Sequence, residues 1–339
     1  MFLNIGFCYE WWNSQYGLRF GKEFHFDQDR KIAQLLFMDQ AMRKRFPWSN
    51  ELMPEMQNIS DINMNIEPFG HRFVPALFGC EVAYSDANSP WAVEHILTPA
   101  EIETMPFWTM DEFSRDEKVK TIAEQTSYVR QKYGRCSSQQ NLGSVINTAI
   151  YLRGMELFTD FFERPELVHR LYALITNRMM LAYEYCSQLD GKPADTGVGN
   201  CSVCMLSPQI YQDFNRKYDM QIMELARSKG VCFGIHQDSD VTSFIDAYRP
   251  FDYLFGFDIG FDTNIALFRK AFPRIPLNIC LYTSFLNDRT PGEIEKDILK
   301  LAVDGGDPDL TGFTCVDIDS NVPDEKVTAL CEAVRSVWS

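Results

Sequence analysis

Several features that define other classes of protein are missing from this sequence. No apolar run approaches the ~20 residues that a membrane-spanning helix needs, and Met1–Cys8 has neither a basic leader nor a long apolar core. We therefore expect no signal peptide and no membrane contact. No glycine-rich fingerprint of the GxGxxG or GxxxxGK type follows a candidate strand, which weighs against a nucleotide site. Low-complexity segments and glycine–serine linkers are also absent, which favours a single domain.

Basic residues are scarce relative to acidic ones. The 339 residues include 32 Lys and Arg against 47 Asp and Glu, a formal charge of −15. Proteins that bind nucleic acids need cationic side chains to neutralise phosphates, so this balance disfavours a nucleic-acid partner. Hydrophobic residues make up 45% of the chain, enough for a substantial core, so disorder is excluded.

Cysteine is present but not dense. Ten cysteines are scattered from Cys8 to Cys331, without the close spacing of a disulfide-stabilised secreted domain. This usage fits a reducing, cytoplasmic environment in which most thiols are small buried hydrophobic groups.

Short apolar runs alternate with longer amphipathic stretches from about residue 140 onward, which is typical of successive β-α units. We expect a first strand at 2–8, and later buried parallel strands at 231–235, 253–257, 276–282 and 312–318. Helices are expected at 209–228, 292–303 and 324–337, each preceded by a polar cap and a proline. Repeated units over this length favour a (β/α)8 TIM barrel over an open sheet. We predict one such domain over residues 1–339, with an amino-terminal extension around its mouth.

Chemistry in such a barrel is expected where strands end at the carboxyl-terminal face. One strand delivers His236 and Asp238, which share a face because alternate side chains do, and the last delivers Cys315. Imidazole, carboxylate and thiolate together suit Zn²⁺ and leave a fourth position open. The spacing equally allows a hydrogen-bonded His236 and a Cys315 in the core, and Cys280 or Glu81 could complete a metal shell in place of Asp238.

Other residues near the expected mouth are candidates for substrate contacts. Trp11 and Trp12 could form an aromatic wall for a flat ligand with Glu10 as a catalytic acid, or they could pack in a loop. Glu81 is a second candidate acid, or a partner for His71 or Arg72.

A segment containing glycine, 194–199, precedes Asn200, which we expect to hydrogen-bond substrate. Cys201 and Cys204 form a lone CxxC pair, which we interpret as mostly structural because a structural zinc needs four ligands.

Several motifs together resemble the uroporphyrinogen decarboxylase superfamily, and within it the branch of corrinoid-dependent methyltransferases. The motifs are Phe69-Gly-His71, Phe78-Gly-Cys-Glu-Val82, Tyr151-Leu-Arg-Gly-Met-Glu156, Arg164-Pro-Glu-Leu-Val-His-Arg170, Leu206-Ser-Pro-Gln-Ile-Tyr211, Gly234-Ile-His236, Thr290-Pro-Gly-Glu-Ile294 and Val322-Pro-Asp-Glu325. The resemblance runs over most of the chain and implies a (β/α)8 barrel.

The methyltransferases of that branch bind zinc through an HxC pair and a late Cys. His236 and Cys315 match, whereas Asp238 stands where that branch has Cys. A carboxylate is harder than a thiolate, so the metal would favour oxygen over thiol substrates. The arginines by which the decarboxylases bind substrate carboxylates have no counterpart near this amino terminus.

The resemblance therefore implies a zinc enzyme that moves a methyl group from a small methylated donor to cobalamin on a separate corrinoid protein. The expected donor is a methoxylated aromatic, because the expected mouth is aromatic. A cofactor-free decarboxylase is the alternative enzyme, and a non-enzymatic docking factor for the corrinoid protein is a third hypothesis. Assembly as a homodimer stays open.

Overall fold

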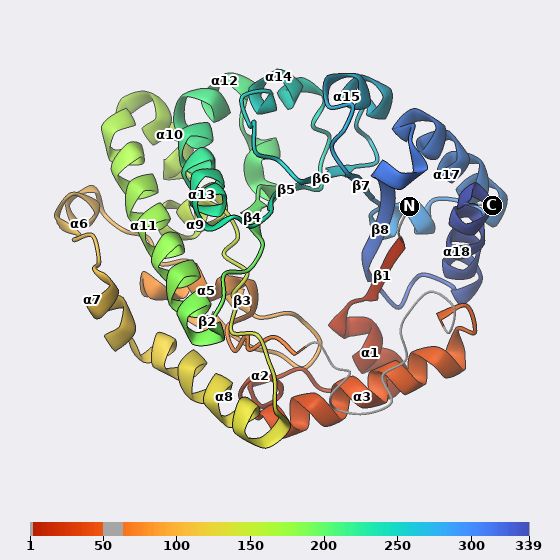
Figure 1. Ribbon diagram of the computed structural model, residues 1–339, viewed down its shortest axis with the longest axis horizontal. Helices are drawn as coiled ribbons and strands as arrows, with labels where there is room; N and C mark the ends of the chain where they lie inside the picture. The colour runs from red at the N-terminus through yellow and green to blue at the C-terminus, as the bar shows by residue number, and fades with distance from the viewer. Residues whose placement is uncertain (1–2, 50–63, 339) are drawn as a thin grey trace.

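A parallel sheet of six strands forms the centre of the molecule. The structure is a computed structural model, which describes residues 3–49 and 64–338. The strands lie in the order β1-β8-β7-β6-β5-β4 and curl into an arc (Figure 1). Their bounds are β1 Leu3–Phe7, β4 Thr196–Gly199, β5 Phe233–Gln237, β6 Gly256–Gly260, β7 Leu277–Cys280 and β8 Thr311–Ile318.

Two irregular segments extend the arc beyond β4. Residues 64–66 and 137–143 are joined by a single parallel bridge between Asn65 and Ser137, and the Gly199 amide donates to the Gly143 carbonyl at 2.9 Å. The expected α/β architecture with parallel strands is confirmed. The eight-stranded barrel is confirmed only in part, because the described residues hold six strands in this sheet.

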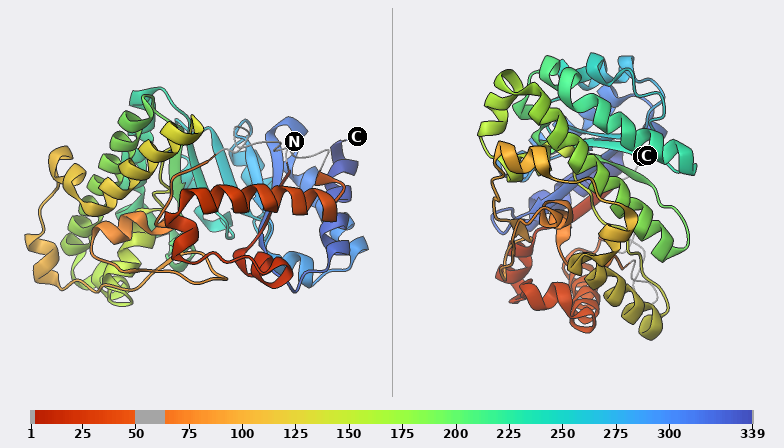
Figure 2. Two further views of the ribbon diagram at one scale, coloured as in Figure 1. Left: turned by 90° about the horizontal axis from the view of Figure 1, so that it is seen from below. Right: turned by 90° about the vertical axis from the view of Figure 1, so that its left-hand side faces the viewer.

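Helices cover the outer face of the arc and close its open side. Helices α1, α2 and α3 lie on the opposite side of the molecule from α12–α15 (Figures 1 and 2). The helices are α1 Tyr9–Tyr16, α2 Lys22–Phe26, α3 Gln28–Arg45, α5 Phe73–Leu77, α6 Pro99–Thr104, α7 Met110–Arg115, α8 Glu117–Tyr133, α9 Val145–Arg153, α10 Glu156–Glu163, α11 Pro165–Asp190, α12 Pro208–Ile210, α13 Arg216–Lys229, α14 Ile245–Tyr248, α15 Ile265–Ala271, α16 Thr283–Asn287, α17 Pro291–Gly305 and α18 Asp324–Trp338. A hairpin of β2 Val82–Ala83 and β3 Trp91–Ala92 stands apart from the main sheet.

The local signals at helix starts work as expected in two cases. The Thr290 hydroxyl accepts from the Glu293 amide, and the Glu293 side chain accepts from the Thr290 amide, so a capping box opens α17. The Ser207 side chain caps α12. The helix expected at 209–228 is interrupted, however, by a π-helical turn at Tyr211–Asn215, a feature often found at functional sites.

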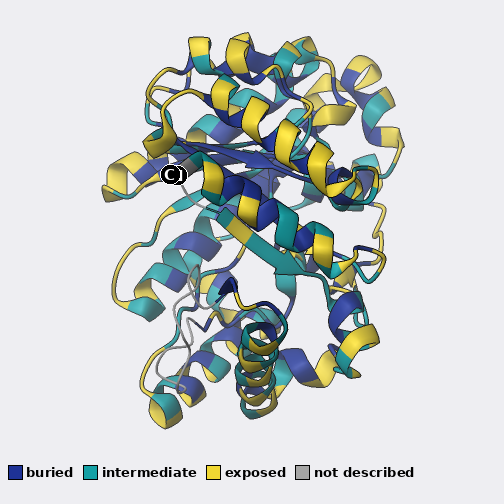
Figure 3. Ribbon diagram, turned by 90° about the vertical axis from the view of Figure 1, so that its right-hand side faces the viewer, coloured by how far each residue is buried: buried dark blue, intermediate teal, exposed yellow. Residues whose placement is uncertain are grey.

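The core lies between the sheet and the outer helices. The strands are largely buried while the outward helix faces are exposed (Figure 3). On β5 the residues Phe233, Ile235 and Gln237 are fully buried, whereas Gly234 and His236 are half-buried. This alternation places His236 inside the arc and its neighbours against the helices. Among the described residues, no helix is long and apolar enough to cross a membrane.

Candidate metal centre

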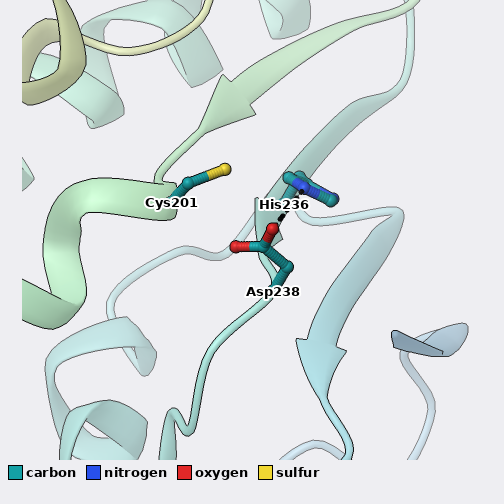
Figure 4. Close-up of side chains that lie close together, drawn as sticks. All are labelled: Cys201, His236 and Asp238. Atoms are coloured by element: carbon teal, nitrogen blue, oxygen red, sulfur yellow. Dashed lines mark ion pairs between the residues drawn. The ribbon is translucent and has the colours of Figure 1, made fainter. Parts of the chain in front are cut away.

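Three side chains converge at the carboxyl-terminal ends of β4 and β5. Cys201 begins the short 3-10 helix η3 Cys201–Met205 directly after β4, while His236 and Asp238 lie at the end of β5. One ligand atom from each lies within 4.8 Å of the other two. His236 Nε2 and Asp238 Oδ2 are 3.8 Å apart, and the Cys201 thiol points toward both (Figure 4).

The spacing of these atoms fits a tetrahedral metal. Zinc bonds of about 2.0–2.3 Å put neighbouring donor atoms roughly 3.5 Å apart, so the observed group needs only small side-chain movements to bind the ion. A thiolate, an imidazole and a carboxylate form a donor set that zinc prefers. Three protein donors leave a fourth position for a substrate.

Asp258 fixes the orientation of the histidine ring. Strand register pairs His236 with Asp258 on β6, and His236 Nδ1 lies 2.9 Å from Asp258 Oδ2. This contact leaves Nε2 directed at the group, as in the carboxylate–histidine pairs that support metal ligands.

Electrostatics in the group favour a protonated His236 when no metal is bound. The neighbouring carboxylates of Asp238 and Asp258 raise the pKa of His236 well above its usual range despite partial burial. The same contact with His236 lowers the pKa of Asp238. A metal ion that binds Nε2 would therefore displace a proton that the two neighbouring carboxylates stabilise on the His236 ring.

The structure does not bring Cys315 to this group. Thr314 on β8 exchanges two hydrogen bonds with Asn278 on β7, at 2.7 and 3.0 Å, and side chains alternate along a strand. Cys315 consequently faces the outer helices, where it is fully buried. Burial raises the pKa of Cys315 itself to about 12, which disfavours the thiolate.

Cys280 is the late-strand thiol on the inner face. It shares that face with Asn278, and burial, followed by the charge of Asp258, raises its pKa to about 12. The charges of His236 and Asp238 also affect the pKa of Cys280, but Cys280 lies outside the group of three.

The two expected catalytic acids lie elsewhere. Both carboxylate oxygens of Glu10 accept hydrogen bonds from Ser320, one from the amide at 3.0 Å and one from the hydroxyl at 2.7 Å. Glu10 thus holds α1 against the segment after β8. Glu81 is exposed and stands just before β2.

Trp11 and Trp12 belong to the core. They lie on helix α1, not in a loop, with exposed fractions of 1% and 3%. The ring of Trp11 packs 4.1 Å from that of Phe7, and the Arg45 guanidinium covers it at 4.7 Å. The packing alternative for these tryptophans is therefore the one that the structure shows.

Asn200 lies next to the group of three side chains, in a buried layer on the side away from the donor atoms. Its backbone amide donates to the His236 carbonyl at 2.6 Å. Its side-chain Nδ2 donates to Asp219 on α13 at 2.8 Å. The Tyr211 hydroxyl, from the π-helical turn, donates to the same Asp219 oxygen at 2.9 Å. Asn200 and Asp219 are fully buried, and burial raises the pKa of Asp219 to about 7.

The same buried layer continues on β5. Tyr248 of α14 donates to Gln237, the last residue of β5, which lies between His236 and Asp238. The network thus supports the backbone on both sides of the donor atoms: Asn200 precedes Cys201, and Gln237 separates His236 from Asp238.

Cys201 belongs to this group, although its lone CxxC pair predicts a mostly structural role. The signal that could have found it is its position, one residue beyond Asn200 at the end of β4, the neighbour of β5 in the sheet. Its CxxC partner Cys204 is exposed and points back to the Cys201 carbonyl at 3.2 Å.

A cavity of about 450 Å³ lies inside the arc below His236. It is bounded by β4, β5 and β6 and by residues 139–143, and it reaches His236 and Asp258 at one end. No lysine or arginine lines it among the described residues.

Comparisons with known proteins agree with this architecture. The uroporphyrinogen decarboxylase (URO-D) family matches residues 58–337. One similar solved structure is a methyltransferase from Methanosarcina mazei, with a TM-score of 0.59 and 15% sequence identity, covering 79% of this chain and 78% of that chain. A search of curated proteins finds no match. The family match spans most of the chain, so the expected superfamily is confirmed, and this chain belongs to the uroporphyrinogen decarboxylase family.

Proposed function

We propose that this protein is a zinc-dependent methyltransferase that moves a methyl group from a small methylated donor to cobalamin carried by a separate corrinoid protein. The convergence of Cys201, His236 and Asp238 at the carboxyl ends of the strands carries the proposal. A fold shared with a methyltransferase from Methanosarcina mazei supports it.

The proposed ligand set keeps two residues expected from the sequence and changes the third. His236 supplies Nε2 and Asp238 supplies a carboxylate oxygen, while Cys201 takes the role expected of Cys315. When bound, zinc would polarise the oxygen of an ether donor and make it a better leaving group. Asp258 holds the His236 ring in place for that task.

An aromatic pair next to Asp238 supports an O-methylated aromatic donor. The rings of Phe261 and Tyr282 lie 5.3 Å apart, and burial, followed by the charge of Asp238, raises the pKa of the Tyr282 hydroxyl. A Cβ on Gly260 would lie 2.6 Å from that hydroxyl and 2.7 Å from the Asp238 carbonyl, so glycine permits their close approach. Tyr282 is thus a better-placed hydrogen-bond donor to the oxygen of a leaving phenoxide than Glu10 or Glu81.

The carboxyl-terminal mouth also offers a contact for a partner. Met205, at the end of η3, is 52% exposed beside the exposed Cys204. An uncharged contact is needed because a chain of charge −15 repels another acidic protein.

The alternative functions have less support. A decarboxylase of polycarboxylates needs cationic partners for its substrate, and the cavity has none among its described lining residues. A docking factor without turnover needs no convergent donor set at the barrel mouth. Turnover separates the docking factor from the methyltransferase.

The test combines metal content with methyl transfer. The purified protein is mixed with reduced cobalamin and a panel of methoxyaromatics, with and without a corrinoid protein, while the cobalt spectrum is recorded. We expect one zinc per chain and formation of methylcobalamin with at least one donor. Decarboxylation of a porphyrinogen without metal, and no methylcobalamin from any donor, would contradict the proposal.

A further inference from the structure

The inside of the strand arc is hollow because three glycines stand side by side. Strand register aligns Gly197 of β4 with Gly234 of β5, and Gly234 with Gly256 of β6. A barrel of this class normally fills its interior with layers of side chains. Here the layer below His236 has no side chains on three neighbouring strands, and the cavity of about 450 Å³ occupies that space.

Crowding does not explain all three glycines. A Cβ on Gly197 would lie 2.4 Å from the Gly234 carbonyl oxygen, so that position requires glycine. A Cβ on Gly256 would meet nothing within 4 Å, and one on Gly234 would meet its nearest atom at 3.6 Å. Side chains could therefore occupy two of the three positions, and their absence keeps the cavity open.

The walls of the cavity carry polar groups that have no partner within the described residues. Gln140, with an exposed fraction of 9%, donates through Nε2 to two carbonyls, but its Oε1 accepts nothing. Gln139 Nε2 is likewise buried without an acceptor. Unpaired buried polar atoms cost roughly 1–3 kcal/mol each, so a bound molecule that pairs with them after rotation of the two amide groups toward the cavity would be stabilised.

The charge of the walls selects the kind of molecule. Asp195 stands at the amino-terminal end of the cavity, and at the other end the Asp258 carboxylate is paired with His236. Other polar groups on the walls include the amides of Gln139, Gln140 and Asn141, and no lysine or arginine is present among the described lining residues. A ligand carboxylate brought into this space would lose its hydration without gaining a lysine or arginine partner, and Asp195 would repel it. An uncharged or cationic molecule would not meet that penalty.

We propose that this chamber binds a small uncharged or cationic molecule that carries hydrogen-bond donors and acceptors. This proposal rests on the proposed function: the bound molecule is the methyl donor, held with its methyl end toward His236. The volume lies in the range of about 300–1,000 Å³ usual for small-molecule sites.

The first test varies only the charge of the ligand. Binding of 3-methoxybenzylamine, 3-methoxyphenol and 3-methoxybenzoate to the purified protein is measured by calorimetry without cobalamin. We expect the amine and the phenol to bind at least ten times more tightly than the benzoate. Benzoate binding as tight as that of the phenol, or no binding by any of the three, would overturn the proposal.

The second test fills the chamber. Gly256→Leu places a side chain in the open space and should weaken phenol binding at least tenfold, whereas Gly292→Leu, whose Cβ also meets nothing within 4 Å but which lies in the first turn of α17, should not. Unchanged binding in Gly256→Leu would overturn the proposal, and the charge series decides the matter if this variant does not fold. If the ligands bind but no methyl group is transferred, the proposed function is contradicted and the ligand chamber is not. If methyl transfer occurs and Gly256→Leu does not affect it, the proposal that the chamber binds the methyl donor is contradicted and the proposed function is not.

Discussion

The two halves of the strand arc differ in what fills their inner face. The hollow arc, β4 to β6, presents Gly197, Gly234 and Gly256 with His236 and Asp258 above them. The packed arc, β7, β8 and β1, carries on its inner face Asn278, which pairs in register with Asp258, and its hydrogen-bond partner Thr314. On β1, a Cβ on Gly6 would lie 3.3 Å from Val316. The candidate ligand-binding residues thus lie where the interior of the arc is open. The side-chain packing that stabilises the fold lies where the interior is filled.

The strongest way to break this comparison is to remove a donor atom from the hollow arc. His236→Ala should lower zinc affinity more than about 100-fold, because losing a ligand exceeds the 10- to 100-fold effect of losing its supporting partner. The fold should persist, since the core lies on the opposite face of the sheet. Zinc affinity is measured by competition with a chromophoric chelator, and stability by urea denaturation.

The matched substitution in the packed arc should do the reverse. Thr314→Val leaves the buried Asn278 amide without its partner, which costs about 1–3 kcal/mol of stability. Zinc affinity should stay the same. If Thr314→Val lowers zinc affinity as much as His236→Ala, the division between the two arcs is wrong.

An intermediate effect is expected at Asp258. Asp258→Asn keeps the size of the side chain but removes the charge that orients the His236 ring, and zinc affinity should fall about 10- to 100-fold. Cobalt substitution provides a second measurement, because its visible spectrum reports the ligand geometry. An unchanged spectrum together with unchanged affinity would show that Asp258 does not position the ring.

A separate expected effect, on stability and not on zinc affinity, concerns the buried carboxyl behind the hollow arc. Burial raises the pKa of Asp219 to about 7, against about 3.9 in the unfolded chain. Between these pH values the unfolded chain releases a proton that the folded protein retains, so stability falls as pH rises, by about 1.4 kcal/mol per pH unit. Below pH 4 and above pH 7 this contribution is constant.

Asp219→Asn removes that titration. The free energy of unfolding of the variant, relative to the original protein, should therefore rise between pH 4.5 and pH 8 in urea denaturation. Asp160→Asn is the control for losing a buried carboxylate: it breaks the ion pair with buried Arg153 and should lower stability at every pH. A difference for Asp219→Asn that does not change with pH would contradict the account.

The sequence predicted the later β-α units well because their signals are local. The predicted start of the strand at 276–282 lies within one residue of β7, and the caps at Ser207 and Thr290 begin helices as expected. The ends of parallel strands meet at one edge, so His236 and Asp238 could be placed at a common site from position alone.

The remaining site residues depended on information that strand position does not contain. Cys315 has a suitable position along β8, but which face it occupies is set by the pairing of Thr314 with Asn278 on the neighbouring strand. Trp11 and Trp12 were assigned to the mouth because they follow the first strand, and tertiary packing against Phe7 and Arg45 places them in the core. The lone CxxC spacing of Cys201 and Cys204 indicates a structural role, and only the three-dimensional arrangement brings Cys201 to His236 and Asp238.

The identity of the third ligand tests the account most directly. Zinc per chain is measured by elemental analysis in Cys201→Ser and Cys315→Ser, with Cys204→Ser as the control for an exposed thiol in the same segment. The account predicts that Cys201→Ser loses most of its zinc, whereas Cys315→Ser and Cys204→Ser keep about one ion per chain. Loss of zinc in Cys315→Ser with full zinc in Cys201→Ser would contradict it.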